Sequence, residues 1–187
     1  EGCDYLTSLS IPGSIKALGE STFSGCTALG SVTLNSGLET IGKWCFAQCA
    51  VSEIAIPGSV KTLGTGAFSQ CSNLQSVSLP KGLVSIGESA FAGCKSLGSV
   101  TFPASLTGIG ESAFYDCDSL TSVEVPMSVV DMVQEAFGDC DNLIELTIDP
   151  KLFHSAGAWK VSRVVIPNGV TAIPDEAFMD WSKIASV

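Results

Sequence analysis

The sequence predicts a solenoid, a right-handed superhelix with one parallel β-sheet and short helical or 3₁₀ turns. Three observations predict this fold. A block of about 23 residues recurs along nearly the whole chain, each block contains a strand-like alternation of apolar and polar residues, and each block closes on Ala-Phe-x-x-Cys or a close variant. One block is too short to bury its own apolar face, whereas stacked blocks bury the faces of their neighbours.

The period of the repeat is marked by phenylalanines that are each followed by a cysteine three residues later. The cysteines of successive pairs are 22 or 23 residues apart, and Cys3 closes an earlier block. The pairs are Phe23/Cys26, Phe46/Cys49, Phe68/Cys71, Phe91/Cys94, Phe114/Cys117 and Phe137/Cys140.

Each block begins with a predicted strand. In the copy at 74–79, Val77 and Leu79 alternate with polar residues, which is typical of a strand with one buried face. A proline usually follows and ends the pairing, because it has no amide hydrogen to donate. The expected strands lie near 6–11, 29–34, 51–56, 74–79, 97–102, 120–125, 143–148 and 161–166.

The second half of each block contains an apolar pair, a glycine and the phenylalanine–cysteine box. In one copy these are Leu83 and Ile86, then Gly87, where we expect a turn that a side chain would strain. The box is too short for a long helix, so we expect one helical or 3₁₀ turn with Phe and Cys pointing inward.

The complete block, C-x-x-L-x-x-V-x-L-P-x-x-L-x-x-I-G-x-x-A-F-x-x-C, resembles the BspA-like class of leucine-rich repeats. The resemblance covers nearly the whole chain and implies a leucine-rich repeat solenoid. It also implies a surface-exposed or secreted interaction protein of bacteria or some protists, of a kind linked to adhesion to host proteins or other cells.

The segments "GESAF" at 87–91 and 110–114 look like part of the G-x-S-x-G elbow of serine hydrolases. Both belong to the repeated block, and each has a phenylalanine where the elbow needs its last glycine. A nucleophilic serine also needs a base, and the one histidine of the chain, His154, lies far along the sequence. We therefore expect Ser89 and Ser112 to be turn residues on the solvent side, and we expect no enzymatic activity.

One block departs from the pattern, and we predict an irregular, short coil at 140–159. Trp159 and Trp181 are expected where the cysteine of the box belongs. We expect residues 1–187 to form a single array of about eight coils. The chain opens at the end of a block and closes within a strand, which predicts a piece of a longer array. Coils without caps would permit end-to-end self-association.

Eight cysteines require an explanation, and seven of them fall in the repeat; Cys45 takes the place of the box alanine. Parallel side chains in a core favour free, buried thiols. Neighbouring cysteines would still lie within the Cα range of a disulfide, so that alternative stays open. Free thiols fit a reducing or anaerobic setting, or a cytosolic protein.

No motif for a cofactor is present, so no cofactor is predicted. The cysteine and histidine spacings do not form a zinc site. Two carboxylate pairs flank cysteines of adjacent coils, Asp116/Asp118 and Asp139/Asp141. They are expected to form a solvated acidic ridge, with a loose calcium site as the alternative.

The net charge of −10 argues against nucleic acid and anionic membranes as partners. No apolar stretch approaches 18 residues, so we expect no membrane insertion of this segment. Residues 1–93 carry six acids against four lysines, whereas residues 94–187 carry thirteen acids against five bases. The negative charge is therefore concentrated in the second half.

A binding surface is expected on the outward side chains of the last strands. The N-terminal strands carry small neutral residues there, whereas the later ones carry charged and apolar side chains and the only arginine. We predict a non-enzymatic protein-binding module, either a cell-surface adhesion domain or, alternatively, a cytoplasmic scaffold, with a protein partner that is basic. The predicted site residues are Ser122, Glu124, Ile144, Glu145, Thr147, Ser162 and Arg163.

Overall fold

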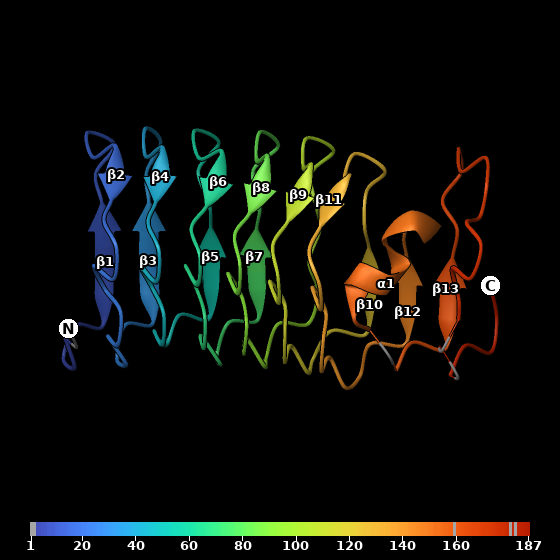
Figure 1. The fold of residues 1–187 in the computed structure, drawn as a ribbon. Coiled ribbons are helices and arrows are strands. Elements are labelled where there is room, and N and C mark those ends of the chain that lie inside the picture. Colours follow the sequence, from blue (N-terminus) through green and yellow to red (C-terminus); the bar gives the residue numbers. More distant parts are fainter. Residues whose placement is uncertain (1–2, 159, 180, 182) are drawn as a thin grey trace.

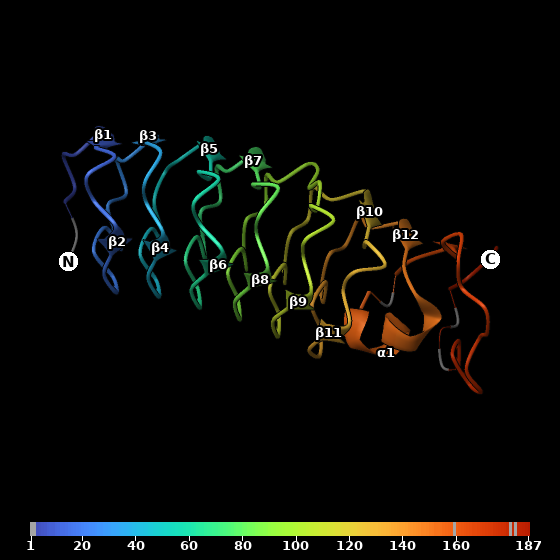
Figure 2. The same ribbon diagram turned by 90° about the horizontal axis from the view of Figure 1, so that it is seen from above.

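The computed structural model describes residues 3–158, 160–179, 181 and 183–187, and the chain winds as a right-handed solenoid (Figures 1 and 2). A typical coil rises along one strand, turns, and returns along a second, shorter strand, and the N-terminus and C-terminus lie at opposite ends of the array (Figure 1). All strand pairs are parallel. The predicted fold class, a leucine-rich repeat solenoid, is confirmed.

The first wall of the solenoid consists of the predicted strands. It is divided into the pairs β1–β3 and β5–β7 and the three-stranded run β10–β12–β13, so the single sheet that we expected is interrupted. At 97–102 there is no regular strand, only an isolated bridge between Ser76 and Ser99. The strands are β1 (Ser8–Ile11), β3 (Ser31–Leu34), β5 (Glu53–Ala55), β7 (Ser76–Ser78), β10 (Ser122–Glu124), β12 (Glu145–Thr147) and β13 (Arg163–Val165).

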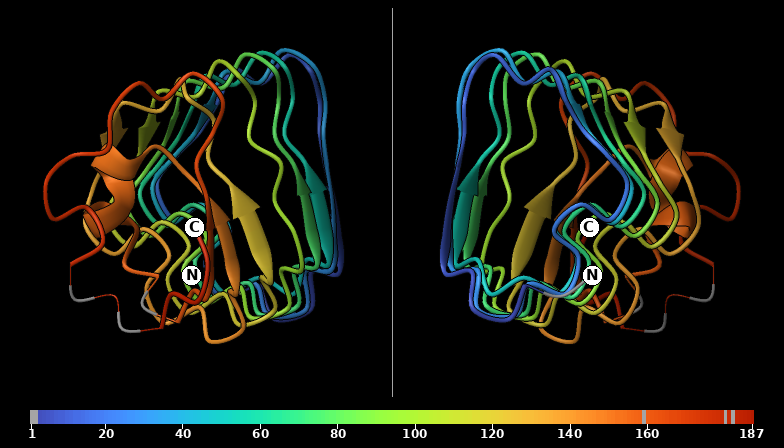
Figure 3. Two further views of the ribbon diagram at one scale, coloured as in Figure 1. Left: turned by 90° about the vertical axis from the view of Figure 1, so that its right-hand side faces the viewer. Right: turned by 90° about the vertical axis from the view of Figure 1, so that its left-hand side faces the viewer.

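The second wall is a six-stranded parallel sheet that the sequence did not predict. Each strand is only two residues long and includes the second member of the apolar pair, such as Leu63 or Ile86, which is buried. Figure 3 shows the two walls on opposite sides of the coil. The strands are β2 (Ala17–Leu18), β4 (Thr40–Ile41), β6 (Thr62–Leu63), β8 (Ser85–Ile86), β9 (Gly108–Ile109) and β11 (Asp131–Met132).

Glycine follows five of the six second-wall strands, and at Gly87 it is needed for a reason other than the predicted turn strain. Gly87 does not have a positive φ angle. A Cβ atom on Gly87 would instead lie 2.6 Å from the carbonyl oxygen of Leu63 and 2.8 Å from the carbonyl carbon of Gly64. Glycine is therefore required by the close approach of neighbouring coils.

The third wall is built from the phenylalanine–cysteine boxes, which form consecutive i to i+3 turns in place of the helical or 3₁₀ turn that we expected. The Cys71 amide donates to the Phe68 carbonyl over 3.2 Å within one box. Boxes of adjacent coils are also joined, since the Phe46 amide donates to the Ala67 carbonyl over 2.8 Å. The residues two before and two after a box phenylalanine have left-handed backbones; Ser89 and Ser112 are examples, each with φ of 52°.

The core contains a continuous stack of the six box phenylalanines. Successive ring centroids are 5.2–5.5 Å apart and the ring planes are within 17° of parallel. All but Phe23 are fully buried, and the box cysteines lie beside them. The inward direction predicted for Phe and Cys is confirmed.

The segment predicted to be irregular contains η1 (Pro150–Leu152) and α1 (Phe153–Ala156). The Asp149 side chain caps η1 by accepting from the Lys151 amide over 3.0 Å. Phe153 is fully buried, and its ring lies 4.9 Å from that of Phe178 and 3.8 Å from that of Trp181. Trp159 lies outside the described residues, so its predicted position stays a prediction.

Candidate functional site

The three-stranded run β10–β12–β13 brings most of the predicted site residues together on the outer side of the first wall. Parallel pairing aligns Ser122 with Glu145 and Glu145 with Arg163 in one row, and it aligns Glu124 with Thr147 in a second row. The residues between the rows are buried, so both rows face outward. Ser162 directly precedes β13, next to the first row.

Ile144 lies beside the rows rather than within them. It precedes β12, and its carbonyl oxygen accepts the amides of Ser162 and Arg163 over 3.1 and 3.0 Å. Its side chain is 57% exposed. The position therefore presents a branched apolar side chain at the edge where the strands begin.

The charges of the rows are partly balanced within the chain. The Arg163 guanidinium forms an ion pair with the Glu145 carboxylate on the neighbouring strand. Glu124 makes no ion pair within the described ranges. A surface ion pair contributes only about 0–1 kcal/mol to folding stability. Because Arg163 is paired with Glu145, Glu124 is the carboxylate of these rows that is available to a partner.

A surface hollow of about 550 Å³ adjoins the second row. It is lined by Glu124, Thr147 and Val165 and, past the strand ends, by Met127, Ile166 and Pro167. Met127 is 42% exposed. The second row is thus continuous with a depression whose lining is partly polar and partly apolar.

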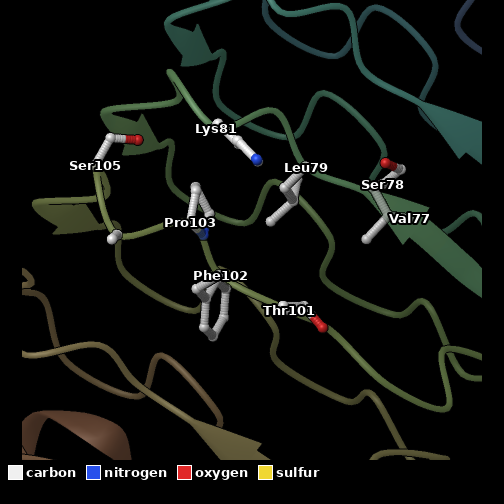
Figure 4. Close-up of a pocket in the computed structure, with 9 residues that line it drawn as sticks. Val77, Ser78, Leu79, Lys81, Thr101, Phe102, Pro103 and Ser105 are labelled. Carbon is white, nitrogen blue, oxygen red and sulfur yellow. The ribbon is translucent and has the colours of Figure 1, made fainter.

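A larger hollow of about 730 Å³ lies at the interruption of the first wall (Figure 4). We call it the Phe102 hollow; its lining includes Val77, Leu79, Lys81, Phe102, Pro103 and Ala104. This hollow was not predicted from the sequence. The available signal was Phe102 itself, which occupies a strand position that is aliphatic in the other coils.

The acidic ridge is partly balanced by two lysines of the chain and receives one hydroxyl hydrogen bond. The Lys95 ammonium lies 3.0 Å from the Asp116 carboxylate and 3.5 Å from that of Asp118. Lys160 pairs with Asp141, and the Tyr115 hydroxyl donates to Asp139. These contacts hold the carboxylates apart, and in the described part of the chain no group of three or more His, Cys, Asp or Glu side chains could hold a metal ion.

The thiols are protected by burial. Seven cysteines are buried, Cys3 is exposed, and all eight are free thiols. Burial is the main cause that raises the pKa of Cys45, Cys49 and Cys94 to about 12, with neighbouring thiols adding to the rise for Cys45 and Cys49. Because the thiolate is the reactive form, these side chains are unsuited to nucleophilic chemistry at neutral pH.

The remaining polar candidates do not form a catalytic arrangement. Ser89 and Ser112 are half-buried turn residues, as predicted. His154 is exposed on α1, and its Nε2 atom lies 3.3 Å from the Glu176 carbonyl oxygen. Within the described ranges, no helix is long and apolar enough to cross a bilayer.

The repeated first-wall strand, the box turn and the Phe and Cys ladders define a leucine-rich repeat protein. Residues 1–88 and 70–185 match the model of the BspA type leucine rich repeat region, in six copies. The chain belongs to this family, as the sequence pattern indicated. Family membership indicates a protein-interaction module, and the family's repeats and solenoid fold are generally non-enzymatic.

Solved bacterial leucine-rich repeat proteins share the fold. A leucine-rich repeat protein of T. pallidum is 24% identical with a TM-score of 0.64; the match covers 91% of this chain and 79% of that one. The pneumococcal vaccine antigen PcpA is 23% identical with a TM-score of 0.63, and the match covers 88% of this chain and 51% of that one. No curated protein matches the sequence.

Proposed function

We propose that the chain is a non-enzymatic protein-binding module that uses the outer surface of β10, β12 and β13. The observation that carries this proposal is the three-stranded run, which displays Glu145 and Arg163 in one row and Glu124 in the other, next to a depression lined by Met127, Val165 and Ile166 as well as polar residues. Interfaces gain most of their energy from a few anchors of this kind, whereas the small neutral residues of β1 and β3 offer none.

The partner that fits this surface is a basic protein segment. Among the described residues Glu124 makes no ion pair, and residues 94–187 carry an excess of eight negative charges. Such a surface speeds the approach of a cationic partner at low salt. The Arg163–Glu145 pair fixes the geometry of the first row and contributes less net charge.

We propose that the chain acts at the cell surface, in adhesion or another protein interaction. The support for this proposal is membership of the BspA type family and the similarity in fold to PcpA, which is itself a vaccine antigen. The alternative is a cytoplasmic scaffold that uses the same surface. The seven buried free thiols favour that alternative, since unpaired cysteines are typical of a reducing compartment.

The test is a paired charge reversal, Glu124→Lys with Glu145→Lys, assayed against purified matrix proteins of high and low isoelectric point. We expect the parent to bind basic members of the panel, with affinity falling as salt rises from 50 to about 200 mM, and the variant to lose most of that binding. Glu88→Lys with Glu111→Lys is the control, because it changes net charge equally on exposed residues outside the first wall. Equal losses in both variants would contradict the proposed site.

The cellular location of the chain is tested separately in the cells that produce it. Antibody labelling of intact cells, compared with permeabilised cells, reports whether the chain is exposed at the surface. Labelling that requires permeabilisation would favour the scaffold alternative and leave the proposed binding surface unaffected.

A further inference from the structure

The first wall lacks inter-coil hydrogen bonds at its interruptions. In intact regions the amide of the last inward residue donates to the next coil: Val125 to the Thr147 carbonyl over 2.8 Å, and Ile148 to the Val165 carbonyl over 3.2 Å. The equivalent amides of Leu34, Leu79 and Phe102 have no backbone acceptor among the described residues. The Leu79 and Phe102 amides are adjacent in the array and both border the Phe102 hollow.

The size of the Phe102 side chain explains the interruption. Its ring is packed inward, with its centroid 5.5 Å from Phe114 in an edge-on arrangement and 6.4 Å from Phe137. The other coils have a smaller aliphatic residue at this position. A larger side chain in a packed core is accommodated by shifting backbone, and here regular strand pairing is lost on both sides of 97–102, with only the Ser76–Ser99 bridge retained. The aliphatic residues are Ile11, Leu34, Ile56, Leu79, Val125, Ile148 and Ile166.

The Phe102 hollow combines an apolar floor with a hydrogen-bond donor and a positive charge. Val77, Leu79, Phe102 and Pro103 supply apolar lining, and the Leu79 amide is an unused donor. Lys81 points over the space between Leu79 and Pro103 (Figure 4). Lys81 makes no ion pair with any residue that the structure describes.

The hollow continues along the solenoid axis. A second hollow of about 440 Å³ lies at the other interruption, between β3 and β5, and it shares Val77 and Ser78 with the first. Together they form a depression across several coils on the outer side of the first wall. Its length suits an extended segment better than a single small molecule.

We propose that the Phe102 hollow binds an extended segment of a protein partner, with an apolar side chain in the hollow and a neighbouring carboxylate at Lys81 and the Leu79 amide. The acidic group follows from charge complementarity, because Lys81 is the one charged side chain of the lining and is cationic, and the Leu79 amide is a donor beside it. The hydroxyls of Ser78, Thr101 and Ser105, which also line the hollow, can donate to the same group. A polyanion is a poorer occupant, since the net charge of −10 repels it. A segment with one acid and an apolar neighbour avoids most of that repulsion.

This inference rests on the proposed protein-binding function but uses different coils from the β10–β12–β13 surface. The two sites also differ in the sign of the group that they select, since Glu124 attracts a cation and Lys81 attracts an anion. An experiment that varies Lys81 and Glu124 separately can therefore distinguish failure of one from failure of the other.

The experiment is selection of random 12-residue peptides displayed on phage against the immobilised parent chain. We expect enriched peptides to carry an apolar residue within two positions of Asp or Glu. Synthetic copies of these peptides should bind Lys81→Glu at least tenfold more weakly. A new selection on Lys81→Glu should enrich Lys or Arg instead.

Two further variants complete the test. Ala104→Trp adds bulk to an exposed lining residue and should block the enriched peptides. Glu124→Lys with Glu145→Lys should leave their binding unchanged. A thermal melt verifies folding, and Lys81→Glu decides the result if Ala104→Trp does not fold.

Two outcomes would overturn the inference: no enrichment above the bare support, or peptides that bind Lys81→Glu as tightly as the parent. Peptides sensitive only to the Glu124 and Glu145 reversal would also overturn it, while supporting the proposed function. Failure of the matrix panel together with Lys81-dependent peptide binding would contradict only the proposed β10–β12–β13 site.

Discussion

The Cys71 thiol donates a hydrogen bond to the backbone carbonyl oxygen of Phe46, 3.0 Å away in the preceding coil. The same oxygen also accepts the Cys49 amide over 3.2 Å, which closes the box turn. Equivalent thiol bonds of 3.0–3.3 Å occur in five consecutive coils. The repeated cysteine is therefore a small apolar filler that also ties each turn to the one before it.

We predict that Cys71→Ala lowers the free energy of unfolding by about 1–2 kcal/mol, because it removes one hydrogen bond and leaves a small cavity. Cys71→Ser retains a donor and should be no worse than the alanine variant. Denaturant unfolding of the two variants gives the comparison. A serine variant clearly less stable than the alanine variant would show that the thiol acts through packing alone.

We predict that the native protein reacts rapidly with a thiol reagent at Cys3 alone, because the other seven thiols are buried. In denaturant without reductant, all eight should react. A smaller number there would demonstrate disulfides and contradict the free thiols of the structure.

We predict that stability falls as the pH rises from about 9 to about 12. Burial raises the pKa of Cys45 from its ordinary value near 9 to about 12. Below pH 9 the thiol is protonated in both states, so it adds no pH dependence. Between the two pKa values only the unfolded chain releases the proton, which favours unfolding.

Cys45→Ala provides the matched comparison, because four other boxes have alanine at this position: Ala67, Ala90, Ala113 and Ala136. The variant should lose little stability at pH 7, and its Tm should decline less steeply above pH 9. Thermal melts at intervals between pH 7 and 11 measure the two slopes. Equal slopes would show that the Cys45 thiol does not cause the alkaline loss.

The positions of the first-wall strands and the inward direction of the box Phe and Cys side chains could be predicted from the sequence. The alternation of apolar and polar residues and the 23-residue period that indicate them are patterns visible along the chain itself. The sequence could not show the second wall, since a strand such as Thr62–Leu63 is too short for an alternation to be visible. The interruption at Phe102 depends on contacts with Phe114 and Phe137, which are distant in sequence. The Arg163–Glu145 pair likewise required the strand register.

We predict that Phe91→Ala lowers the free energy of unfolding by about 3–5 kcal/mol. Phe91 is fully buried, and its ring stacks on Phe68 at 5.5 Å and on Phe114 at 5.2 Å. Phe23→Ala is the control, because Phe23 is half-buried and stacks only on Phe46 among the described rings. Denaturant unfolding should show a clearly smaller loss for the control, and similar losses would contradict the importance of the central stack.

We predict that the amides of Leu79 and Phe102 exchange with solvent deuterium about tenfold faster than those of Val125 and Ile148, because the latter pair donates to neighbouring coils and the former does not. Hydrogen exchange followed by NMR resolves the four amides. Phe102→Ile removes the bulky ring and should slow exchange at Leu79, since isoleucine occupies this position where the wall is paired, as at Ile56 and Ile148. Unchanged exchange at Leu79 in this variant would show that the ring does not hold the strands apart, and that the hollow has another origin.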